Sequence, residues 1–409
     1  MMNDEGKLFV GIDWATETHQ VAAVDVTGKL LAERAVPHTA EGLAGMCDWV
    51  ASFGVPASRV RLAIEMPHGS VVETLLEREL AVFSLNPRQL DRFRDRYSMS
   101  GAKDDRRDAF VLANALRTDE HCFRRLAFTP EDALVLREWS RVADDLSAER
   151  VRLANRLREQ LRRYYPQFLK AVRDPSTEWA MALWSKLPAP SKVSGRSKQS
   201  IASVLKTHRI RRVTATDVLR VLREPALHVA PGTERAARAH IVLLIERLQL
   251  LARQLRSART ELQALLDSMT QAPNEDRSCE QSDATILLSL PGVGPIVAAA
   301  LLAEAPQPLA DRDYHAARAL AGVAPVTRRS GKRKPAVHMR RGCNLRLRNA
   351  LYHWARIATQ HDSLSRARYA ALRARGHSHG RALRSVADRL LSVLMAMLRT
   401  GTTFRANPS

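Results

Sequence analysis

The sequence predicts an α/β domain at the N-terminus, long coiled-coil helices after it, and a mostly α-helical C-terminal domain. Three patterns predict this order: short apolar runs between turn residues at the start, heptad spacing of apolar residues in the middle, and helical spacing again near the end. With 409 residues, 45% of them apolar, the chain is long enough for two or three domains with sizeable cores. We expect boundaries at 1–125, 130–275 and 280–400.

The N-terminal domain is predicted from alternating strand and helix patterns. Residues 8–36 contain β-favouring runs separated by turn residues, which indicates consecutive antiparallel strands. Two further strands are expected, ending near Glu65 and Asn86. Helical patterns occupy the segments between and after them, namely 40–53, 70–80 and about 104–117.

The middle of the chain is predicted to contain two long helices. The first carries apolar residues at steps of four or seven until Pro166 interrupts it. The second has a heptad seam, and the alternative is an ordinary amphipathic helix packed on its own domain. The two helices predict a helical hairpin, or arms that dimerise. The seam consists of Ile241, Leu244, Leu248, Leu251, Leu255, Ala258, Leu262, Leu265 and Met269.

Between these helices lies an insertion, about 172–235, whose stretch 187–200 is rich in Pro, Ser and Lys. This composition is typical of a flexible basic linker, and the alternative is an inserted nucleic-acid contact.

The charge of the chain predicts a polyanionic partner, because 64 Lys and Arg stand against 43 Asp and Glu, a net charge of +21. The excess is uneven: residues 1–118 carry −3 and residues 280–409 carry +14. No apolar run reaches 18 residues and the N-terminus lacks a signal-peptide pattern, so we expect no membrane span. The four cysteines lack CxxC spacing, which argues against a zinc site or a disulfide framework and fits a reducing cytosol.

Four carboxylates form the first candidate site. Asp13 and Glu65 each end a predicted strand, and Asp105 and Asp108 share one face of a predicted helix. Such a cluster is stable mainly when divalent cations neutralise it, and oxygen ligands select Mg²⁺ or Mn²⁺. Taken singly, each acid also has an ordinary explanation, such as a turn cap or a pair with Arg106 or Arg107. Asp104 is predicted to begin the helix and not to bind metal.

The second candidate site is basic. The segment "LPGVG" at 290–294 is typical of a helix-hairpin-helix, in which Gly292 and Gly294 let backbone N–H groups approach a DNA phosphate. The alternative is tight helix packing without DNA. Arg340 and Arg341 follow as further expected nucleic-acid contacts.

Ser330 lies in the basic tract "RRSGKRK", where it is flanked by Arg328, Arg329, Lys332, Arg333 and Lys334. These cations could hold a phosphate and stabilise a pentacovalent transition state. From composition alone, a phosphate-binding loop is favoured over a nucleophile. Tyr352 is a rival hydroxyl whose apolar neighbours predict a core position, and His377 and His379 predict a polar turn.

Six segments of the sequence share an order with those of a known family. They are "FVGIDWATETHQVAAVD", "AIEMPHG", "GAKDDRRDAFVLANALR", "LPGVGPIVAAALLAE", "AGVAPVTRRSGKRK" and "MRRGCNLRLRNALYHWA". In this order they resemble the DEDD insertion-sequence transposases of the Piv/MooV type, which include the bridge-RNA-guided recombinases. The resemblance covers about 1–118 and 283–400. It implies a RuvC-like, RNase H-like domain whose metal ligands fall on Asp13, Glu65, Asp105 and Asp108, and a transposase domain carrying Ser330.

The resemblance also implies chemistry and partners. Ser330 would attack DNA and form a covalent phosphoserine intermediate, assisted by Mg²⁺. The implied partners are donor and target DNA, a structured noncoding bridge RNA, and further copies of the chain in a dimer or tetramer, in a prokaryotic cytoplasm at the nucleoid. The alternatives are a RuvC-type Holliday-junction nuclease without a covalent intermediate, and a basic architectural DNA-binding protein.

Overall fold

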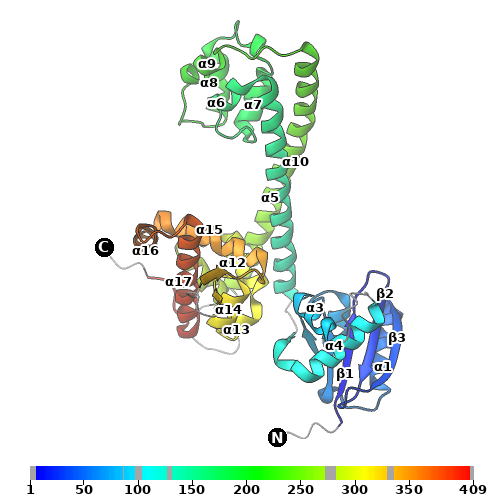
Figure 1. Cartoon of the computed structure of the whole chain (residues 1–409). Helices are drawn as coiled ribbons and strands as arrows, with labels where there is room; N and C mark the ends of the chain where they lie inside the picture. The colour runs from blue at the N-terminus through cyan, green and yellow to red at the C-terminus, as the bar shows by residue number, and fades with distance from the viewer. Residues whose placement is uncertain are drawn as a thin grey trace. The chain divides into compact units, whose positions relative to one another are not determined.

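A computed structural model describes residues 6–85, 87–96, 104–126, 131–271, 282–328 and 336–405. The chain divides into two compact units (Figure 1). Unit 1 is Met1–Pro130 and unit 2 is Glu131–Ser409.

Unit 1 is built on a six-stranded mixed sheet in the order β3-β2-β1-β4-β5-β6. The first three strands pair antiparallel, as predicted. Strand β4 pairs in parallel with β1 and with β5, and β6 pairs antiparallel with β5. This mixed sheet with helices is consistent with an RNase H-like domain. The strands are β1 Leu8–Asp13, β2 Thr18–Val24, β3 Leu30–Pro37, β4 Val60–Ile64, β5 Ala81–Ser84 and β6 Arg124–Arg125.

Helices cover both faces of this sheet, because the central strands are apolar on both sides. Val10 and Leu62 face one core, and Phe9 and Ala63, their neighbours in the pleat, face the other together with Leu112. The first core is closed by α1 and α2, and the second by α3 and α4. The helices are α1 Ala40–Ala51, α2 Ser70–Glu77, α3 Pro87–Asp95 and α4 Asp105–Asp119, with short 3₁₀ turns at Ala57–Arg59 and Glu120–Cys122.

Unit 2 contains an antiparallel hairpin of two long helices, α5 Glu131–Tyr164 and α10 Pro231–Gln271 (Figure 1). The start of α5 shares a core with the end of α10, and the end of α5 shares a second core with the start of α10. The predicted seam lies on α10 and packs against α5. Its residues from Ile241 to Leu262 are buried, while Leu265 and Met269 are partly buried. The prediction of a helical hairpin is confirmed.

The insertion between the long helices is folded, so the prediction of a flexible linker is wrong. Leu187, Ala189 and Val193 are at most 1% exposed, and the Tyr164 hydroxyl donates to the Pro188 carbonyl at 2.7 Å. The apolar residues are spread thinly among Ser and Pro, which conceals their helical spacing. The elements are α6 Pro166–Ala171, α7 Glu178–Lys186, a 3₁₀ turn at Pro190–Lys192, α8 Lys198–Thr207 and α9 Ala215–Leu222.

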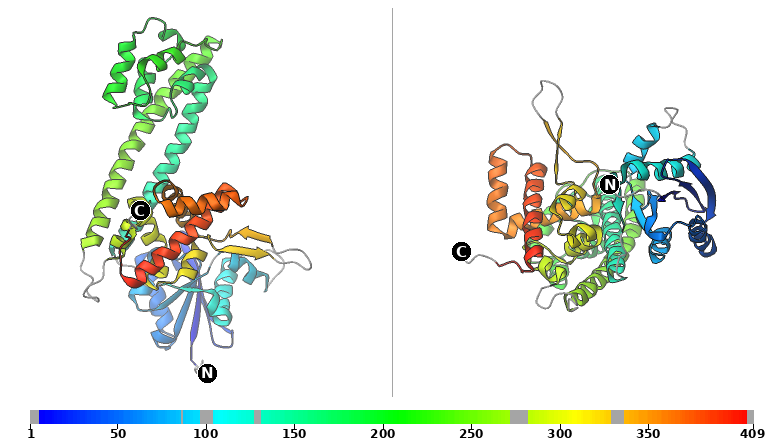
Figure 2. Two further views of the ribbon diagram at one scale, coloured as in Figure 1. Left: turned by 90° about the vertical axis from the view of Figure 1, so that its left-hand side faces the viewer. Right: turned by 90° about the horizontal axis from the view of Figure 1, so that it is seen from below.

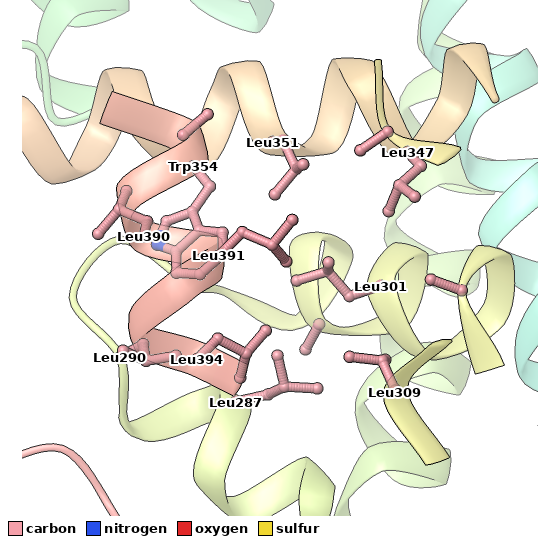
Figure 3. Packing of buried hydrophobic residues seen from close by; sticks show 14 of the residues in the cluster. Leu287, Leu290, Leu301, Leu309, Leu347, Leu351, Trp354, Leu390, Leu391 and Leu394 are labelled. Carbon is pink, nitrogen blue, oxygen red and sulfur yellow. The ribbon is translucent and has the colours of Figure 1, made fainter. Parts of the chain in front are cut away.

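The other end of the hairpin packs into a helical bundle around Trp354, Leu351 and Leu394 (Figure 3). A two-stranded antiparallel sheet projects from this bundle (Figure 2). Among the described residues, no helix combines the length and apolar character that crossing a membrane requires. The elements are α11 Asp283–Ser289, α12 Pro295–Glu304, α13 Pro306–Ala310, α14 Tyr314–Leu320, β7 Pro325–Arg328, β8 Ala336–Met339, α15 Leu345–His361, α16 Ser363–Ala374 and α17 His379–Thr400.

Candidate active site

The first two predicted ligands lie at the same edge of the unit 1 sheet. Strands β1 and β4 are parallel neighbours in which Ile12 is paired with Ile64. Asp13 and Glu65 follow these residues directly, so they leave the sheet side by side at its carboxyl edge. The carboxyl edge of parallel strands is where open α/β sheets bind ligands.

Helix α4 brings the other two carboxylates to this edge. The Asp104 side chain accepts a hydrogen bond from the Arg106 N–H and caps the helix, as predicted. Asp105 and Asp108 therefore lie in the first turn, where the positive end of the helix dipole stabilises negative charge.

The close approach of α4 depends on Gly11 of β1. A Cβ atom at Gly11 would lie 1.9 Å from the Ala109 carbonyl oxygen and 2.6 Å from the Ala113 nitrogen. Any side chain there would displace the helix that carries Asp105 and Asp108. Sequence reasoning missed this requirement, although a glycine inside an apolar strand is a recognised signal of close backbone approach.

The structure brings three of the four predicted ligands together. Ligand oxygens of Asp13, Asp105 and Asp108 all lie within 4.8 Å of one another. Asp108 is 1% exposed, whereas Asp105 is exposed. The group therefore runs from the protein interior to its surface. Glu65 does not join this group, although it is partly buried at the adjacent strand end.

An arginine that sequence reasoning missed holds the buried carboxylate. Arg94 of α3 donates from Nε and Nη2 to the two oxygens of Asp108 at 2.6 and 2.7 Å, and from Nη1 to Asp91 at 2.7 Å. Burial alone would lower the pKa of Arg94, but the hydrogen bonds and charges of Asp108, Asp91 and Glu65 outweigh it, so the pKa is raised. Arg106, a partner considered from the sequence, contacts Glu33 instead at 3.4 Å.

The carboxylate group fits a divalent cation. Three carboxylates lie in close contact, and the guanidinium of Arg94 pairs with the buried one, Asp108. Carboxylate oxygens are ligands that Mg²⁺ and Mn²⁺ prefer, and a divalent ion would reduce the repulsion among the three groups.

A second group of possible ligands, Asp119, His121 and Cys122, lies at the end of α4. The Asp119 carboxylate already accepts hydrogen bonds from Thr118 at 2.7 Å and Arg96 at 3.1 Å. These contacts explain the Asp119 carboxylate as the acceptor of a surface ion pair, without a role as a metal ligand.

In unit 2, strands β7 and β8 frame the predicted serine tract in the sequence. Their register pairs Arg328 with Ala336. Arg340 and Arg341 follow β8 and are exposed. The backbone of Arg328 is described but its side chain is not, and the remaining predicted residues of the tract lie outside the described residues: Arg329, Ser330, Lys332, Arg333 and Lys334.

The two glycines of the "LPGVG" turn have different surroundings. Gly292 has a φ of +84°, and a Cβ atom there would lie 2.8 Å from the Ala358 nitrogen on α15. Tight helix packing, the alternative considered from the sequence, therefore accounts for Gly292. Gly294 precedes α12, and a Cβ atom there would meet no other described atom within 4 Å, so the predicted phosphate contact remains a prediction for this residue.

Tyr352 is not the core residue that its neighbours predicted. It is 36% exposed on the side of α15 away from the buried Trp354. Its hydroxyl oxygen lies 3.4 Å from His379 Nε2, and the Tyr369 hydroxyl lies 2.7 Å from His379 Nδ1. The predicted polar turn thus supplies a histidine beside an accessible tyrosine.

Comparisons with known proteins agree with this arrangement. Residues 10–166 match a transposase family of the DEDD IS110 type, and residues 284–370 match the IS116/IS110/IS902 transposase family. The mini-circle putative transposase for IS117 of Streptomyces coelicolor is 34% identical over 416 residues, which cover 99% of this chain and 97% of that protein.

Two further relatives extend the likeness. The putative transposase y4uE of Sinorhizobium fredii is 49% identical over 239 residues, and this match spans 58% of the chain and 65% of that relative. An IS116 protein of 44.8 kDa from Streptomyces clavuligerus is 27% identical over 421 residues, covering 100% of this chain and 98% of that protein.

Proposed function

This chain belongs to the IS110 family of DEDD insertion-sequence transposases, and we propose that it cuts and joins DNA through a serine nucleophile assisted by a metal-binding carboxylate site. The observation that carries the proposal is the convergence of Asp13, Asp105 and Asp108 at the carboxyl edge of the unit 1 sheet. DNA transesterification is the activity of the family. What we propose is which residues of this chain perform it.

The carboxylate site is proposed to hold Mg²⁺, or Mn²⁺, through Asp13, Asp105 and Asp108, with Glu65 contributing from the adjacent strand. A bound divalent ion there would polarise a phosphodiester and stabilise its developing charge. Asp108 is fixed by Arg94, and Asp105 faces solvent, where a DNA backbone can enter. The rigid strands and the first turn of α4 hold the carboxylates in place before substrate binds.

Ser330 is proposed as the nucleophile. Its hydroxyl oxygen would form a bond to the phosphorus of one DNA strand while the bond from phosphorus to a deoxyribose oxygen breaks, and that oxygen takes up a proton. A hydroxyl of the joining strand would then attack the phosphoserine and release the serine. The basic residues around Ser330 in the sequence support the proposal, because they can hold the phosphate and stabilise its transition state.

The same proposal includes guidance by a bridge RNA and assembly as a dimer or tetramer. It also places the activity at the prokaryotic nucleoid. The +14 charge of residues 280–409 supports binding of donor and target DNA and of an RNA. The relatives named above come from Streptomyces and Sinorhizobium, which are bacteria.

The decisive experiment is a search for a covalent protein–DNA adduct on a denaturing gel. The full chain, with RNA transcribed from the flanks of its element, is incubated with labelled donor and target DNA in Mg²⁺. We expect an adduct with the wild type and none with Ser330→Ala or Asp105→Ala. Metal-dependent cleavage without an adduct, retained in Ser330→Ala, would instead identify a RuvC-type nuclease.

Tyr352 must also be tested as a nucleophile in this experiment, because His379 Nε2 lies 3.4 Å from the Tyr352 hydroxyl and could accept the hydroxyl proton. The variant Tyr352→Phe is expected to form the adduct as the wild type does. An adduct lost in Tyr352→Phe and kept in Ser330→Ala would move the nucleophile from the serine to the tyrosine.

A further inference from the structure

The end of the hairpin formed by α5 and α10 carries a concentrated positive charge. Residues 186–223, which include α8 and α9, contain ten Lys and Arg and a single acid, Asp217. All ten cations are exposed, and we call them the tip surface. They are Lys186, Lys192, Arg196, Lys198, Lys206, Arg209, Arg211, Arg212, Arg220 and Arg223.

The cations of the tip surface differ from those along the hairpin. Among the described residues, seven of the fourteen arginines on the two long helices pair with acids: for example, Arg247 contacts Glu149 at 3.1 Å, and Arg256 contacts Glu178 at 2.8 Å. Within the part of the chain that the structure describes, no cation of the tip surface forms an ion pair. A cluster of cations without ion-pair partners creates a positive surface potential, which is available to attract an anionic partner.

One member of the tip surface adopts a backbone conformation that disfavours it. Arg209 has a φ of +52° at the end of α8, where its N–H donates to the Lys206 carbonyl at 3.1 Å and the next N–H, of Ile210, donates to the Leu205 carbonyl at 2.8 Å. Glycine is the usual residue at this position of a helix end. Arg312 has the same conformation, but its guanidinium is paired with Asp283. Arg209 has the strain without an ion-pair partner among the described residues.

We propose that the tip surface binds the phosphodiester backbone of a duplex nucleic acid. Residues 186–223 contain no Phe, Tyr or Trp, so they lack the stacking platforms with which proteins hold single-stranded bases. Exposed Lys and Arg that contact phosphates bind without reading sequence. The tip surface lies outside both segments that match the transposase families, 10–166 and 284–370. The inference rests on the nucleic-acid substrate of a transposase and concerns a surface separate from the carboxylate group.

The test compares two triple variants of the full chain that lose the same charge. The tip variant is Arg209→Gln, Arg211→Gln, Arg212→Gln. The control is Arg150→Gln, Arg247→Gln, Arg256→Gln, whose arginines are ion-paired on or beside the hairpin. Binding to a 30-base-pair DNA duplex and to the RNA duplex of the same sequence is measured by fluorescence anisotropy in EDTA, so that no strand is cut, over a range of salt concentrations.

We expect the tip variant to bind at least one of the two duplexes about tenfold or more weakly than the wild type. The slope of log K against log salt should become shallower by about 0.9 for each phosphate that the variant no longer neutralises. A loss of affinity confined to one duplex identifies DNA or RNA as the ligand. Unchanged affinity and slope for both duplexes, or an equal loss of affinity in the control, would overturn the inference.

A single substitution separates binding from folding. Arg209→Gly removes the cation and relieves the left-handed backbone, so we expect weaker duplex binding together with an equal or higher melting temperature. Weaker binding together with a lower melting temperature, or unchanged binding, would contradict the assignment. Because these measurements need no catalysis, the inference can stand if Ser330 proves not to be the nucleophile, and can fail if Ser330 is confirmed.

Discussion

The carboxylate group of unit 1 and the tip surface of unit 2 both concentrate charge of one sign, but they are built in opposite ways. The carboxylates are held on rigid strands and a capped helix, and their buried member is already paired with Arg94. The cations of the tip surface are exposed and have no ion-pair partner among the described residues. Charges fixed by packing can position reacting atoms, whereas exposed cations without ion-pair partners can bind the phosphate backbone of a nucleic-acid duplex.

A buried acid in unit 2 shows what a purely structural carboxylate looks like. Glu304 of α12 accepts hydrogen bonds from Arg141 of α5 at 3.1 Å and from Asn344 at 2.6 Å. Burial alone would raise the pKa of Glu304, but these hydrogen bonds and the charges of Arg141 and Arg346 outweigh it, so the pKa is lowered. Both oxygens of Glu304 and both oxygens of Asp108 accept hydrogen bonds, but only Asp108 belongs to a candidate metal group of the described residues.

The largest expected effect comes from breaking the packing under the carboxylates. Gly11→Ala places a methyl group 1.9 Å from the Ala109 carbonyl oxygen and must displace α4. We expect DNA cleavage to fall by about 10²-fold or more and the free energy of unfolding of unit 1 to fall by about 1–3 kcal/mol. Cleavage assays and urea denaturation measure the two effects.

The matched control is Gly45→Ala on α1, where a Cβ atom meets no other described atom within 4 Å. It should leave activity unchanged and stabilise the helix by up to about 1 kcal/mol. If Gly11→Ala cleaves DNA as well as Gly45→Ala does, the carboxylate site does not depend on the approach of α4.

The next effect tests the charge compensation at Asp108. Arg94→Gln leaves the buried carboxylate without its bidentate partner, which should lower the free energy of unfolding without metal by about 1–3 kcal/mol. Repulsion among the carboxylates then favours a cation more strongly, so Mg²⁺ should raise the melting temperature of Arg94→Gln more than that of the wild type. Differential scanning fluorimetry with and without Mg²⁺ measures both changes.

Arg78→Gln is the control, because Arg78 pairs with Asp48 of α1, which belongs to neither candidate metal group of the described residues. It should respond to Mg²⁺ as the wild type does. An identical Mg²⁺ response in all three proteins would mean that Arg94 and the metal do not share Asp108.

The smallest expected effect is a pH dependence of unit 1. His19 is 0% exposed, its Nδ1 accepts from the Ala15 N–H beyond Asp13, and its Nε2 lies 2.9 Å from His38. Burial, and secondarily the charge of His38, lowers the pKa of His19 below its usual 6.5. The unfolded chain therefore binds more protons than the folded one, so stability is full above about pH 6.5 and declines as the pH falls below it.

Urea denaturation of unit 1 between pH 7.5 and 5.5 measures this decline. The variant His38→Gln removes the charge of His38, which is the second cause of the lowered pKa of His19. The loss of stability toward pH 5.5 should therefore be smaller in this variant than in the wild type. Stability that stays flat or rises toward pH 5.5 in the wild type would show that His19 does not titrate in this way.

The sequence predicted those features that depend on local pattern. Strand ends placed Asp13 and Glu65 together, helix spacing put Asp105 and Asp108 on one face, and the apolar seam identified the hairpin. The contact between Arg94 and Asp108 could not be predicted in the same way, because it joins two helices through a geometry that spacing does not encode. The folded insertion was missed since Ser and Pro between its few apolar residues imitate the composition of a linker.

Metal binding by specific carboxylates of unit 1 is the property on which the proposed chemistry depends most directly. We would titrate Mn²⁺ into the full chain and follow free Mn²⁺ by electron paramagnetic resonance, comparing Asp105→Asn with Asp104→Asn. The two substitutions remove the same charge from neighbouring residues, and asparagine keeps the helix cap at Asp104. We expect Asp105→Asn to bind Mn²⁺ at least about tenfold more weakly than the wild type, and Asp104→Asn to bind it as the wild type does. Equal Mn²⁺ binding by all three proteins, or equal losses of affinity in the two variants, would contradict this expectation.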